Sequence, residues 1–270
     1  CIRDRDQIAI QRLDEMRKFV TSGRLPEATR SARPFMNQAP DAPKDPLDPT
    51  KSLNFKFFNG GDVPLSEIKL IDVAGEDMDA LETMKFYENA IRKADLIVFL
   101  MDPLQLGNVR AILSGTPLPP QGTDPFAVLN NLIKVLEEAP SERNPNQKVA
   151  ITLSKFDSFE SITEISGNAL TGLIQKGMQL TRDPNTNAQY LYNSMDGSVL
   201  ESEILGILDR LTIAPFTSLV RNSFEPNSVR YFVVSSLGHS THAERMDSAG
   251  ITSYRISDPI RWALSASRSS

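Results

Sequence analysis

The sequence predicts an α/β fold in which a mostly parallel sheet carries one antiparallel hairpin and helices on both faces. A continuous apolar run at 96–101 has the composition of a parallel strand buried on both faces, 149–153 is predicted to be another buried strand, and 229–234 the final strand. Segments with helical spacing of apolar residues separate these strands, an alternation typical of parallel sheets covered by helices. A length of 270 residues falls between one and two domains, and a single α/β domain over residues 1–270 fits equally well.

Four elements are expected before the first buried strand. Apolar residues three and four positions apart predict a helix at 3–21, and five prolines within 34–49 predict an extended loop. Alternating residues at 53–58 and a second predicted strand at 68–73, separated by a Gly-rich turn, predict an antiparallel hairpin. Helical spacing returns at 76–93, so a helix is expected to lead into the strand at 96–101.

The middle of the chain continues the alternation of helix and strand. A stretch rich in Gly and Pro at 103–123 predicts a long loop. Asp124 and Pro125 are favourable cap and first-turn residues, so a helix is expected to begin there. The strand at 149–153 follows this helix.

The last third of the chain begins with a predicted insertion. Residues from about 158 to 200 are polar and irregular after a short helical stretch. Helical spacing returns at 199–223 and is followed by the strand at 229–234. Asp258 and Pro259 then open a short terminal helix.

The composition excludes several classes of protein. The 29 Lys and Arg residues against 34 Asp and Glu residues give a net charge of −5, which argues against a nucleic-acid binder. One Cys and two His exclude a disulfide framework and a Cys/His zinc cluster. No apolar run reaches the ~18–20 residues of a membrane span, and no secretory leader opens the sequence. A cytoplasmic location is therefore expected.

Polar residues directly follow the predicted strand at 68–73. Asp72, at the end of this strand, has the residue type and position to hold a Mg²⁺ ion through water. Gly75 has no Cβ, so its backbone N–H can approach a terminal phosphate closely. The same two residues also fit a helix cap and a turn, and this four-position pattern alone favours that structural role.

Two further polar segments follow predicted strands. After the strand at 149–153, the Asp157 carboxylate can accept two hydrogen bonds from guanine, and the Lys155 stem can lie over the base. After the strand at 229–234, the segment Ser235-Ser236-Leu237 can offer a backbone N–H to the guanine carbonyl. By itself the first of these segments favours a helix cap at Asp157 with a solvated Lys155, and the second fits any small polar loop.

Together the three segments resemble the motifs of a P-loop GTPase of the small-GTPase type, in the required order. Asp72 and Gly75 match D-x-x-G, Ser154, Lys155 and Asp157 match [N/T]-K-x-D with Ser in first place, and Ser235 and Ser236 match the S-A-x loop. A closer resemblance is to the bacterial double-GTPase family, on segments 23–29, 71–77, 102–104 and 258–262.

The resemblance implies further residues of a site for Mg²⁺ and GTP or GDP. Thr29, in a switch-type loop at 22–52, would place its hydroxyl on Mg²⁺ beside Asp72. Arg24 or Arg30 would be near enough to serve as an arginine supplied in cis. Glu76 would orient the attacking water, although a first-turn acid favoured by the helix dipole is an equal alternative.

One family motif is missing from the sequence. No G-x-x-x-x-G-K-[ST] phosphate loop occurs within the 270 residues, although the family has it just before the first helix. One expectation is that the first strand and this loop lie upstream of Cys1, since Cys is an improbable native start. The other is that the domain lacks the loop and cannot hydrolyse nucleotide.

The resemblance implies a guanine-nucleotide-binding protein that hydrolyses GTP as a conformational switch and binds a protein partner of unknown identity. The alternative is a catalytically inactive pseudo-GTPase that acts as a protein-interaction module. A weaker third possibility is an adenine-nucleotide P-loop enzyme, against which the Ser154–Asp157 tetrapeptide argues.

Overall fold

The computed structural model describes the chain from the hairpin to the terminal helix in nine ranges: 53–58, 64–113, 118, 120–164, 170–175, 178–181, 192–211, 213–235 and 253–266. The predicted helix at 3–21 and the predicted loops at 22–52 and 34–49 lie outside these residues. Two compact units divide the chain, one of residues 1–90 with 242–246, the other of residues 91–241 with 247–270. The single domain expected from the sequence stays a prediction.

The first unit contains the predicted hairpin. Strands β1 (Leu53–Phe58) and β2 (Pro64–Leu70) pair antiparallel, with Phe55 opposite Ile68. The second strand therefore begins and ends a few residues earlier than the strand predicted at 68–73. The hairpin forms a two-stranded sheet of its own among the described residues.

The helix predicted at 76–93 is wrong as a single element. Three short helices occupy this stretch, α2 (Gly75–Met78), α3 (Leu81–Lys85) and α4 (Glu88–Lys93). Extended backbone at Ala80 separates the first two, with ψ of 132°. The fully buried Asp77 accepts a hydrogen bond from the Tyr87 hydroxyl at 3.2 Å. This contact joins two segments that would lie further apart on one continuous helix.

The second unit contains a three-stranded parallel sheet, which confirms the predicted fold class. Strands β3 (Leu96–Met101), β4 (Lys148–Leu153) and β5 (Val229–Val233) lie in the order β3-β4-β5. In this register, Val98 lies opposite Ala150, and Ala150 opposite Arg230. Helices connect the parallel strands, as expected for this class.

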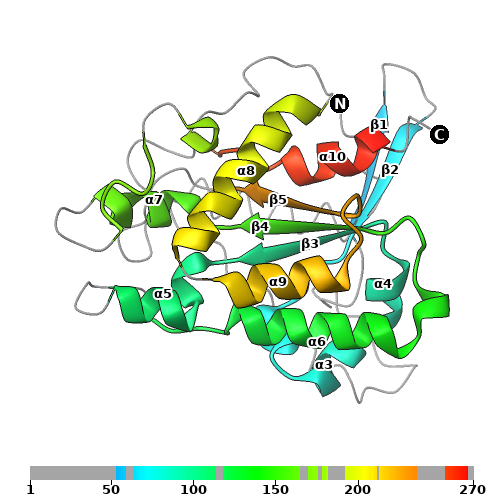
Figure 1. Cartoon of the computed structure of the whole chain (residues 1–270). Helices are drawn as coiled ribbons and strands as arrows, with labels where there is room; N and C mark the ends of the chain where they lie inside the picture. The colour runs from blue at the N-terminus through cyan, green and yellow to red at the C-terminus, as the bar shows by residue number, and fades with distance from the viewer. Residues whose placement is uncertain are drawn as a thin grey trace, which may run out of the picture. The chain divides into compact units, whose positions relative to one another are not determined.

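Helices cover both faces of this sheet (Figure 1). Trp262 of α10 (Asp258–Ala266) forms a core cluster with Ala150 and Phe232 on one face. On the other face, Phe216 of α9 (Ala214–Ser223) contacts Phe99. Helix α6 (Pro125–Glu138) begins at the predicted Asp124 cap, whose carboxylate accepts a hydrogen bond from Phe126 N–H at 3.0 Å. The helices thus cover the sheet as the sequence predicts.

The predicted long loop at 103–123 contains two helical elements, so that prediction is wrong in part. A 3₁₀ turn η2 (Pro103–Gln105) and helix α5 (Gly107–Ile112) form there. The Asp102 carboxylate caps the turn by accepting a hydrogen bond from Leu104 N–H at 2.9 Å. Burial of Leu104 and Val109 stabilises these elements despite the local Gly and Pro content.

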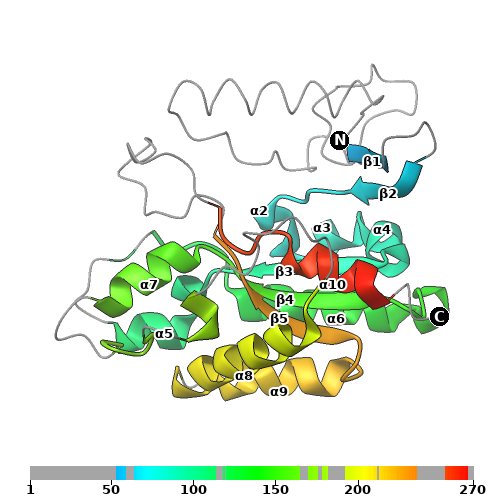
Figure 2. The same cartoon turned by 90° about the horizontal axis from the view of Figure 1, so that it is seen from above.

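The helix predicted at 199–223 is wrong as a single element, because two helices, α8 (Ser194–Arg210) and α9, occupy this stretch (Figure 2). Helix α8 begins earlier than predicted, because the Asn193 side chain caps its first turn. Pro215 lies in the first turn of α9, where its missing N–H costs no helical hydrogen bond. Helix α7 (Phe156–Glu164), the 3₁₀ turn η4 (Gln179–Thr181) and the start of α8 fall within the insertion predicted at 158–200.

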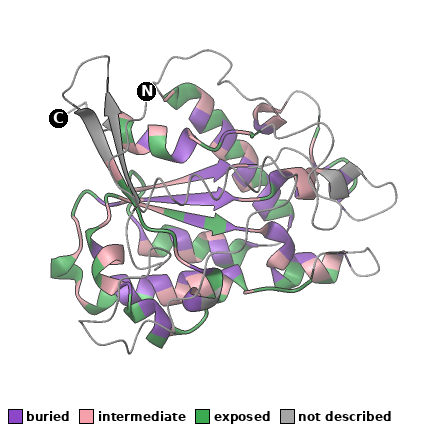
Figure 3. Ribbon diagram, turned by 180° about the vertical axis from the view of Figure 1, so that it is seen from behind, coloured by how far each residue is buried: buried purple, intermediate pink, exposed green. Residues whose placement is uncertain are grey.

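The prediction that 96–101 is buried on both faces is wrong. β3 is an outer strand of the sheet, and Figure 3 shows exposed residues on it, whereas β4 is buried along most of its length. Val98 is 40% exposed and Leu100 is 63% exposed. The apolar composition was typical of a central strand, but among the described residues β3 has a neighbour on one side only.

Candidate functional site

The carboxyl ends of the parallel strands bring several predicted site residues together. Asp102 follows β3, and its Oδ2 atom lies 3.2 Å from the Lys155 ammonium, which follows β4. The Lys155 side chain is 64% exposed and that of Asp102 only 10%. The lysine backbone has a φ of 52°, a left-handed conformation uncommon for a residue with a Cβ. The predicted lysine therefore occupies a strained position beside a largely buried carboxylate.

A second polar contact joins the ends of β4 and β5. The Ser235 hydroxyl donates a hydrogen bond to Asp157 Oδ1 at 2.6 Å. Backbone bonds reinforce this edge, from Ser154 N–H to the Met101 carbonyl at 2.8 Å and from Phe156 N–H to the Val234 carbonyl at 3.2 Å. The structure thus brings Ser154, Lys155, Asp157 and Ser235 to one edge, as parallel topology predicts. Their roles as nucleotide ligands stay predictions.

The remaining predicted site residues lie in the other unit or outside the described residues. Asp72 and Gly75 belong to the first unit, where Gly75 opens α2 and Glu76 is its second residue. A Cβ added at Gly75 would meet nothing within 4 Å, so local packing does not require glycine there. Five predicted residues lie outside the described ranges: Arg24, Thr29, Arg30, Ser236 and Leu237.

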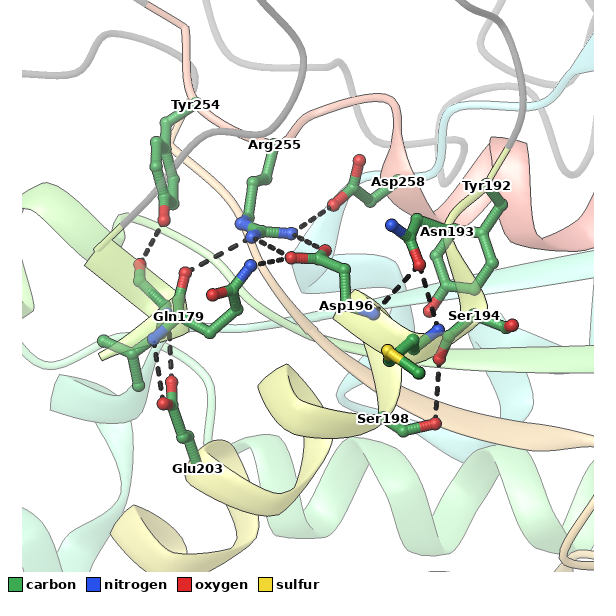
Figure 4. A network of polar contacts seen from close by, with 12 residues as sticks. Gln179, Tyr192, Asn193, Ser194, Asp196, Ser198, Glu203, Tyr254, Arg255 and Asp258 are labelled. Carbon is green, nitrogen blue, oxygen red and sulfur yellow. Dashed lines mark hydrogen bonds and ion pairs between the residues drawn. The ribbon is translucent and has the colours of Figure 1, made fainter. Parts of the chain in front are cut away.

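Sequence reasoning missed a buried ionic network around Arg255 (Figure 4). The side chain of Arg255 is 0% exposed, and its Nη1 atom lies 2.9 Å from Asp196 and 2.8 Å from Asp258. The Nη2 atom donates to the Gln179 carbonyl at 3.2 Å. One arginine thus joins the segment before α10 to the first turn of α8 and to η4.

Two neighbouring side chains extend this network. Glu203 of α8 accepts hydrogen bonds from the N–H groups of Gln179 and Leu180, both at 2.8 Å, and so caps η4. The Tyr254 hydroxyl donates to the Leu180 carbonyl. Burial alone would lower the pKa of Arg255, but hydrogen bonds with Asp196 and Tyr254 outweigh it and raise this pKa. The network therefore holds a permanent buried charge, and its geometry indicates a structural role.

A polar pocket of about 270 Å³ lies beside this network. Tyr192, Glu201, Arg230 and Trp262 contribute to its lining. The Arg230 guanidinium lies 5.6 Å from the Tyr192 ring centroid and 6.0 Å from that of Trp262, and its Nε is 3.6 Å from Glu201. Burial raises the pKa of Glu201, and Arg230 opposes this only in part. The pocket can therefore accept hydrogen bonds and contact a small polar group.

Contacts of one lysine, Lys148, hold α10 next to this pocket. The Lys148 ammonium lies 4.9 Å from the Trp262 ring centroid and donates to the carbonyls of Trp262 and Ala263, both at 3.3 Å. Burial, followed by the charge of Arg230, lowers the pKa of Lys148. A cation at the carboxyl end of a helix is favoured by the helix dipole.

Two kinds of feature are absent from the described residues. Within these residues no group of three or more His, Cys, Asp and Glu side chains is arranged to hold a metal ion. In the same part of the chain, no helix is both long and apolar enough to cross a membrane. The predicted Mg²⁺ ion and the GTP or GDP ligand stay predictions.

Comparison with known proteins gives one informative similarity. A putative ESX-1 scaffolding and assembly protein, SaeC of Mycolicibacterium smegmatis, is 34% identical over 204 residues. The match covers 73% of this chain, but the chain spans only about 50% of the length of that relative. No protein-family model and no solved structure matches the chain.

This similarity corrects the main functional prediction. The similar protein is described as a scaffolding and assembly protein, so the predicted membership of the P-loop GTPases, closest to the bacterial double-GTPase family, is wrong. The predicted function, a GTP-binding protein that hydrolyses GTP as a conformational switch, is wrong for the same reason. The short motifs misled because their residues also form polar contacts within the protein. Ser235 donates a hydrogen bond to Asp157, and Lys155 forms an ion pair with Asp102.

Proposed function

We propose that this chain is a protein-binding module that acts in the assembly of a larger protein complex. The observation that carries the proposal is the 34% identity over 204 residues to the putative ESX-1 scaffolding and assembly protein SaeC. Of the functions weighed from the sequence, the interaction module agrees with this similarity. The partners are then proteins, and components of ESX-1 are the first candidates.

The physical character of the described residues supports this role. The parallel sheet has a well-packed interior, with Ala150, Ile151 and Phe232 all 0% exposed. The Arg255 network fixes α8, η4 and the segment before α10 to one another. A module of this kind presents a rigid surface, and rigid surfaces lose little conformational entropy when they bind a partner.

We also propose a cytoplasmic location for the module, with a bacterial origin for the protein as in its relative. A single Cys in 270 residues leaves no disulfide to form within the chain, which suits a reducing compartment. A fusion with a reporter that is active only in the cytoplasm tests this location. Activity of the reporter is expected, and a reporter active only outside the cytoplasm would refute the location.

A chimera tests the assembly function. The region of SaeC that matches this chain is replaced by the corresponding residues of this chain, in M. smegmatis cells without their own SaeC. We expect the tagged chimera to co-purify with the same ESX-1 components as tagged wild-type SaeC. The matched control carries an unrelated α/β domain of the same length at the same place and is expected to retain none of them.

This test requires that the chimera is folded. Circular dichroism and gel filtration of the purified protein establish that the chimera is folded. A folded chimera that retains no ESX-1 component would refute the proposed function.

A further inference from the structure

The polar pocket described above is lined by residues of α8, α10 and the start of β5. Val229 and Arg230 begin β5, Glu201 belongs to α8, and Trp262 and Ser265 belong to α10. All of its lining residues lie within the second unit. Its volume of about 270 Å³ is just below the range of about 300–1,000 Å³ that is typical of small-molecule sites. An occupant of this pocket is therefore small.

Arg230 is the charged centre of the pocket. Its Nη1 atom donates a hydrogen bond to the Tyr192 hydroxyl at 3.1 Å, and its Nε atom lies 3.6 Å from Glu201. In the part of the chain that the structure describes, Nη2 has no hydrogen-bond partner, although the side chain is only 21% exposed. A guanidinium carries its N–H donors in a fixed plane that matches the oxygens of carboxylates and phosphates. Arg230 therefore keeps donors available for an oxyanion.

The indole of Trp262 is a second donor on the lining. Its contacts with described residues are made by the ring, with Phe232 and Lys148, and by the backbone carbonyl, with Ser265. The Nε1–H thus has no hydrogen-bond partner among these residues, although Trp262 is only 7% exposed. Buried indole N–H groups usually have a partner. An acceptor in the pocket would provide one.

The charges around the pocket favour an anion. The Lys148 ammonium lies against the same Trp262 ring as Arg230, with its Nζ 4.9 Å from the ring centroid. Burial, followed by the charge of Arg230, lowers the pKa of Lys148, so the two cations interact. Among the described residues, Glu201 is the only carboxylate that forms an ion pair with either cation, and it also accepts a hydrogen bond from Tyr231 N–H at 3.3 Å. Two cations and one carboxylate leave an excess of positive charge, which an anion would neutralise.

We propose that this pocket binds the oxyanion group of a small molecule, a carboxylate or a phosphate, through the Arg230 guanidinium and against the Trp262 ring. Nη2 of Arg230 and Nε1 of Trp262 would donate to its oxygens. The inference does not depend on the proposed assembly function, because the ligand is a small molecule and not a protein partner.

The single tryptophan of the chain makes the pocket directly observable, because Trp262 is the only source of tryptophan fluorescence. The probes are inorganic phosphate and succinate, added to the whole 270-residue chain at up to about 10 mM and at constant ionic strength. We expect a saturable change in fluorescence with a Kd in about the millimolar range. Succinamide, which has no charge, is the control probe and is expected to give no saturable change.

Each result of this titration decides the proposal. Saturation by phosphate alone or by succinate alone supports it and identifies the class of oxyanion. Saturation by neither anion, or saturation by succinamide at the same concentration as succinate, overturns it.

A matched pair of variants locates the binding. Asn227 lines the pocket and is exposed, whereas Asn222 is an exposed residue of α9 outside the lining. Asn227→Glu and Asn222→Glu each add one negative charge at the surface, so both proteins are expected to keep the circular dichroism of wild type. We expect Asn227→Glu to raise the Kd about tenfold through repulsion, and Asn222→Glu to change it less than about twofold. An equal Kd in the two variants would overturn the proposal.

Substitution of Arg230 tests the named ligand. Arg230→Gln removes the guanidinium, and Arg210→Gln removes a positive charge at the exposed carboxyl end of α8. We expect only Arg230→Gln to raise the Kd, by at least about tenfold, in calorimetric titrations that do not depend on tryptophan fluorescence. If Arg230→Gln is folded and binds as tightly as Arg210→Gln, the proposal is wrong. If it does not fold, the pair at Asn227 and Asn222 decides.

A segment of the same protein outside this chain is the rival occupant, because the chain spans only about 50% of the length of SaeC. Calorimetric titration of the SaeC chimera separates the two occupants. We expect the chimera to bind the same anion as the 270-residue chain and to lose this binding with Asn227→Glu. A chimera that does not bind the anion, although the 270-residue chain does, would mean that such a segment fills the pocket and would overturn the proposal. Retention of ESX-1 components is measured separately, so failure of the pocket and failure of the proposed function are distinguishable.

Discussion

Arg255 and Asp196 form an ion pair with 2.9 Å between Nη1 and Oδ2, and the two side chains are only 0% and 8% exposed. The pair joins residues 59 positions apart in the sequence. Because charges this deeply buried are stable only when they are paired, the contact fixes the segment before α10 against the start of α8.

Substitution of Arg255 should therefore be strongly destabilising. Arg255→Met leaves the Asp196 and Asp258 carboxylates without the guanidinium that neutralises them, and we expect a loss of about 3–5 kcal/mol in the free energy of unfolding. Urea denaturation measures this loss. Arg210→Met, at the exposed carboxyl end of α8, is the control and should cost less than about 1 kcal/mol. Similar losses in both variants would show that the buried ion pair stabilises the fold no more than the exposed Arg210 does.

Two glycines of α8 should respond to alanine in opposite directions. A Cβ at Gly197 would lie 1.7 Å from the Tyr192 hydroxyl oxygen, whereas a Cβ at Gly206 would meet nothing within 4 Å. We expect Gly197→Ala to cost about 1–3 kcal/mol through overpacking, and Gly206→Ala to gain about 0.5–1 kcal/mol through helix propensity. Thermal and urea denaturation of both variants check this. A gain in stability for Gly197→Ala would show that Tyr192 moves away freely.

Substitutions can test the backbone conformation of Lys155, which follows the carboxyl end of β4. Its φ of 52° suits glycine better than a residue with a Cβ. Lys155→Gly and Lys155→Ala both lose the contact with Asp102, but only alanine keeps the steric cost of the left-handed backbone. We expect the glycine variant to be more stable than the alanine variant by about 1 kcal/mol in urea denaturation. Equal stabilities would show that the backbone changes conformation in the variants.

Glu201 should make stability depend on pH. Burial raises its pKa above the ordinary value of 4.5, so the folded protein holds this proton more tightly than the unfolded chain. The resulting stabilisation is present below pH 4.5 and is lost as the pH rises through the raised pKa. Relative to wild type, Glu201→Gln should therefore have a higher free energy of unfolding at about pH 7 than at about pH 4.

Urea denaturation at both pH values measures this difference. Glu225→Gln, at an exposed position, gives the baseline for removing one negative charge. A relative stability of Glu201→Gln that falls between pH 4 and pH 7 would contradict the sign, and would mean that the contact with Arg230 outweighs burial.

Local sequence patterns determined most elements of the second unit. The apolar runs predicted β3, β4 and β5, and parallel topology then predicted that Ser154, Lys155, Asp157 and Ser235 would meet at one edge. Asp-Pro pairs predicted where α6 and α10 begin. These features were predictable because periodicity and capping act between residues close in the chain.

Motif patterns did not determine the function. The D-x-x-G and [N/T]-K-x-D patterns each fix only a few positions. The residues at these positions also serve as helix caps and as hydrogen-bond or ion-pair partners of nearby groups. The similarity to SaeC extends over 204 residues and so outweighs a pattern of four. Residue types at strand ends predict that polar groups will meet, but not the ligand that they bind.

By itself, the sequence determined the fold class, the order of strands along the chain and the capped starts of two helices, because short-range interactions encode them. Only the tertiary structure decided that β3 pairs on one side only among the described residues, that Arg255 reaches Asp196, and that Gly197 packs on Tyr192. An apolar run has the same composition whether it has one neighbour or two. Contacts between residues far apart in the sequence depend on the packing of whole elements, which no local pattern encodes.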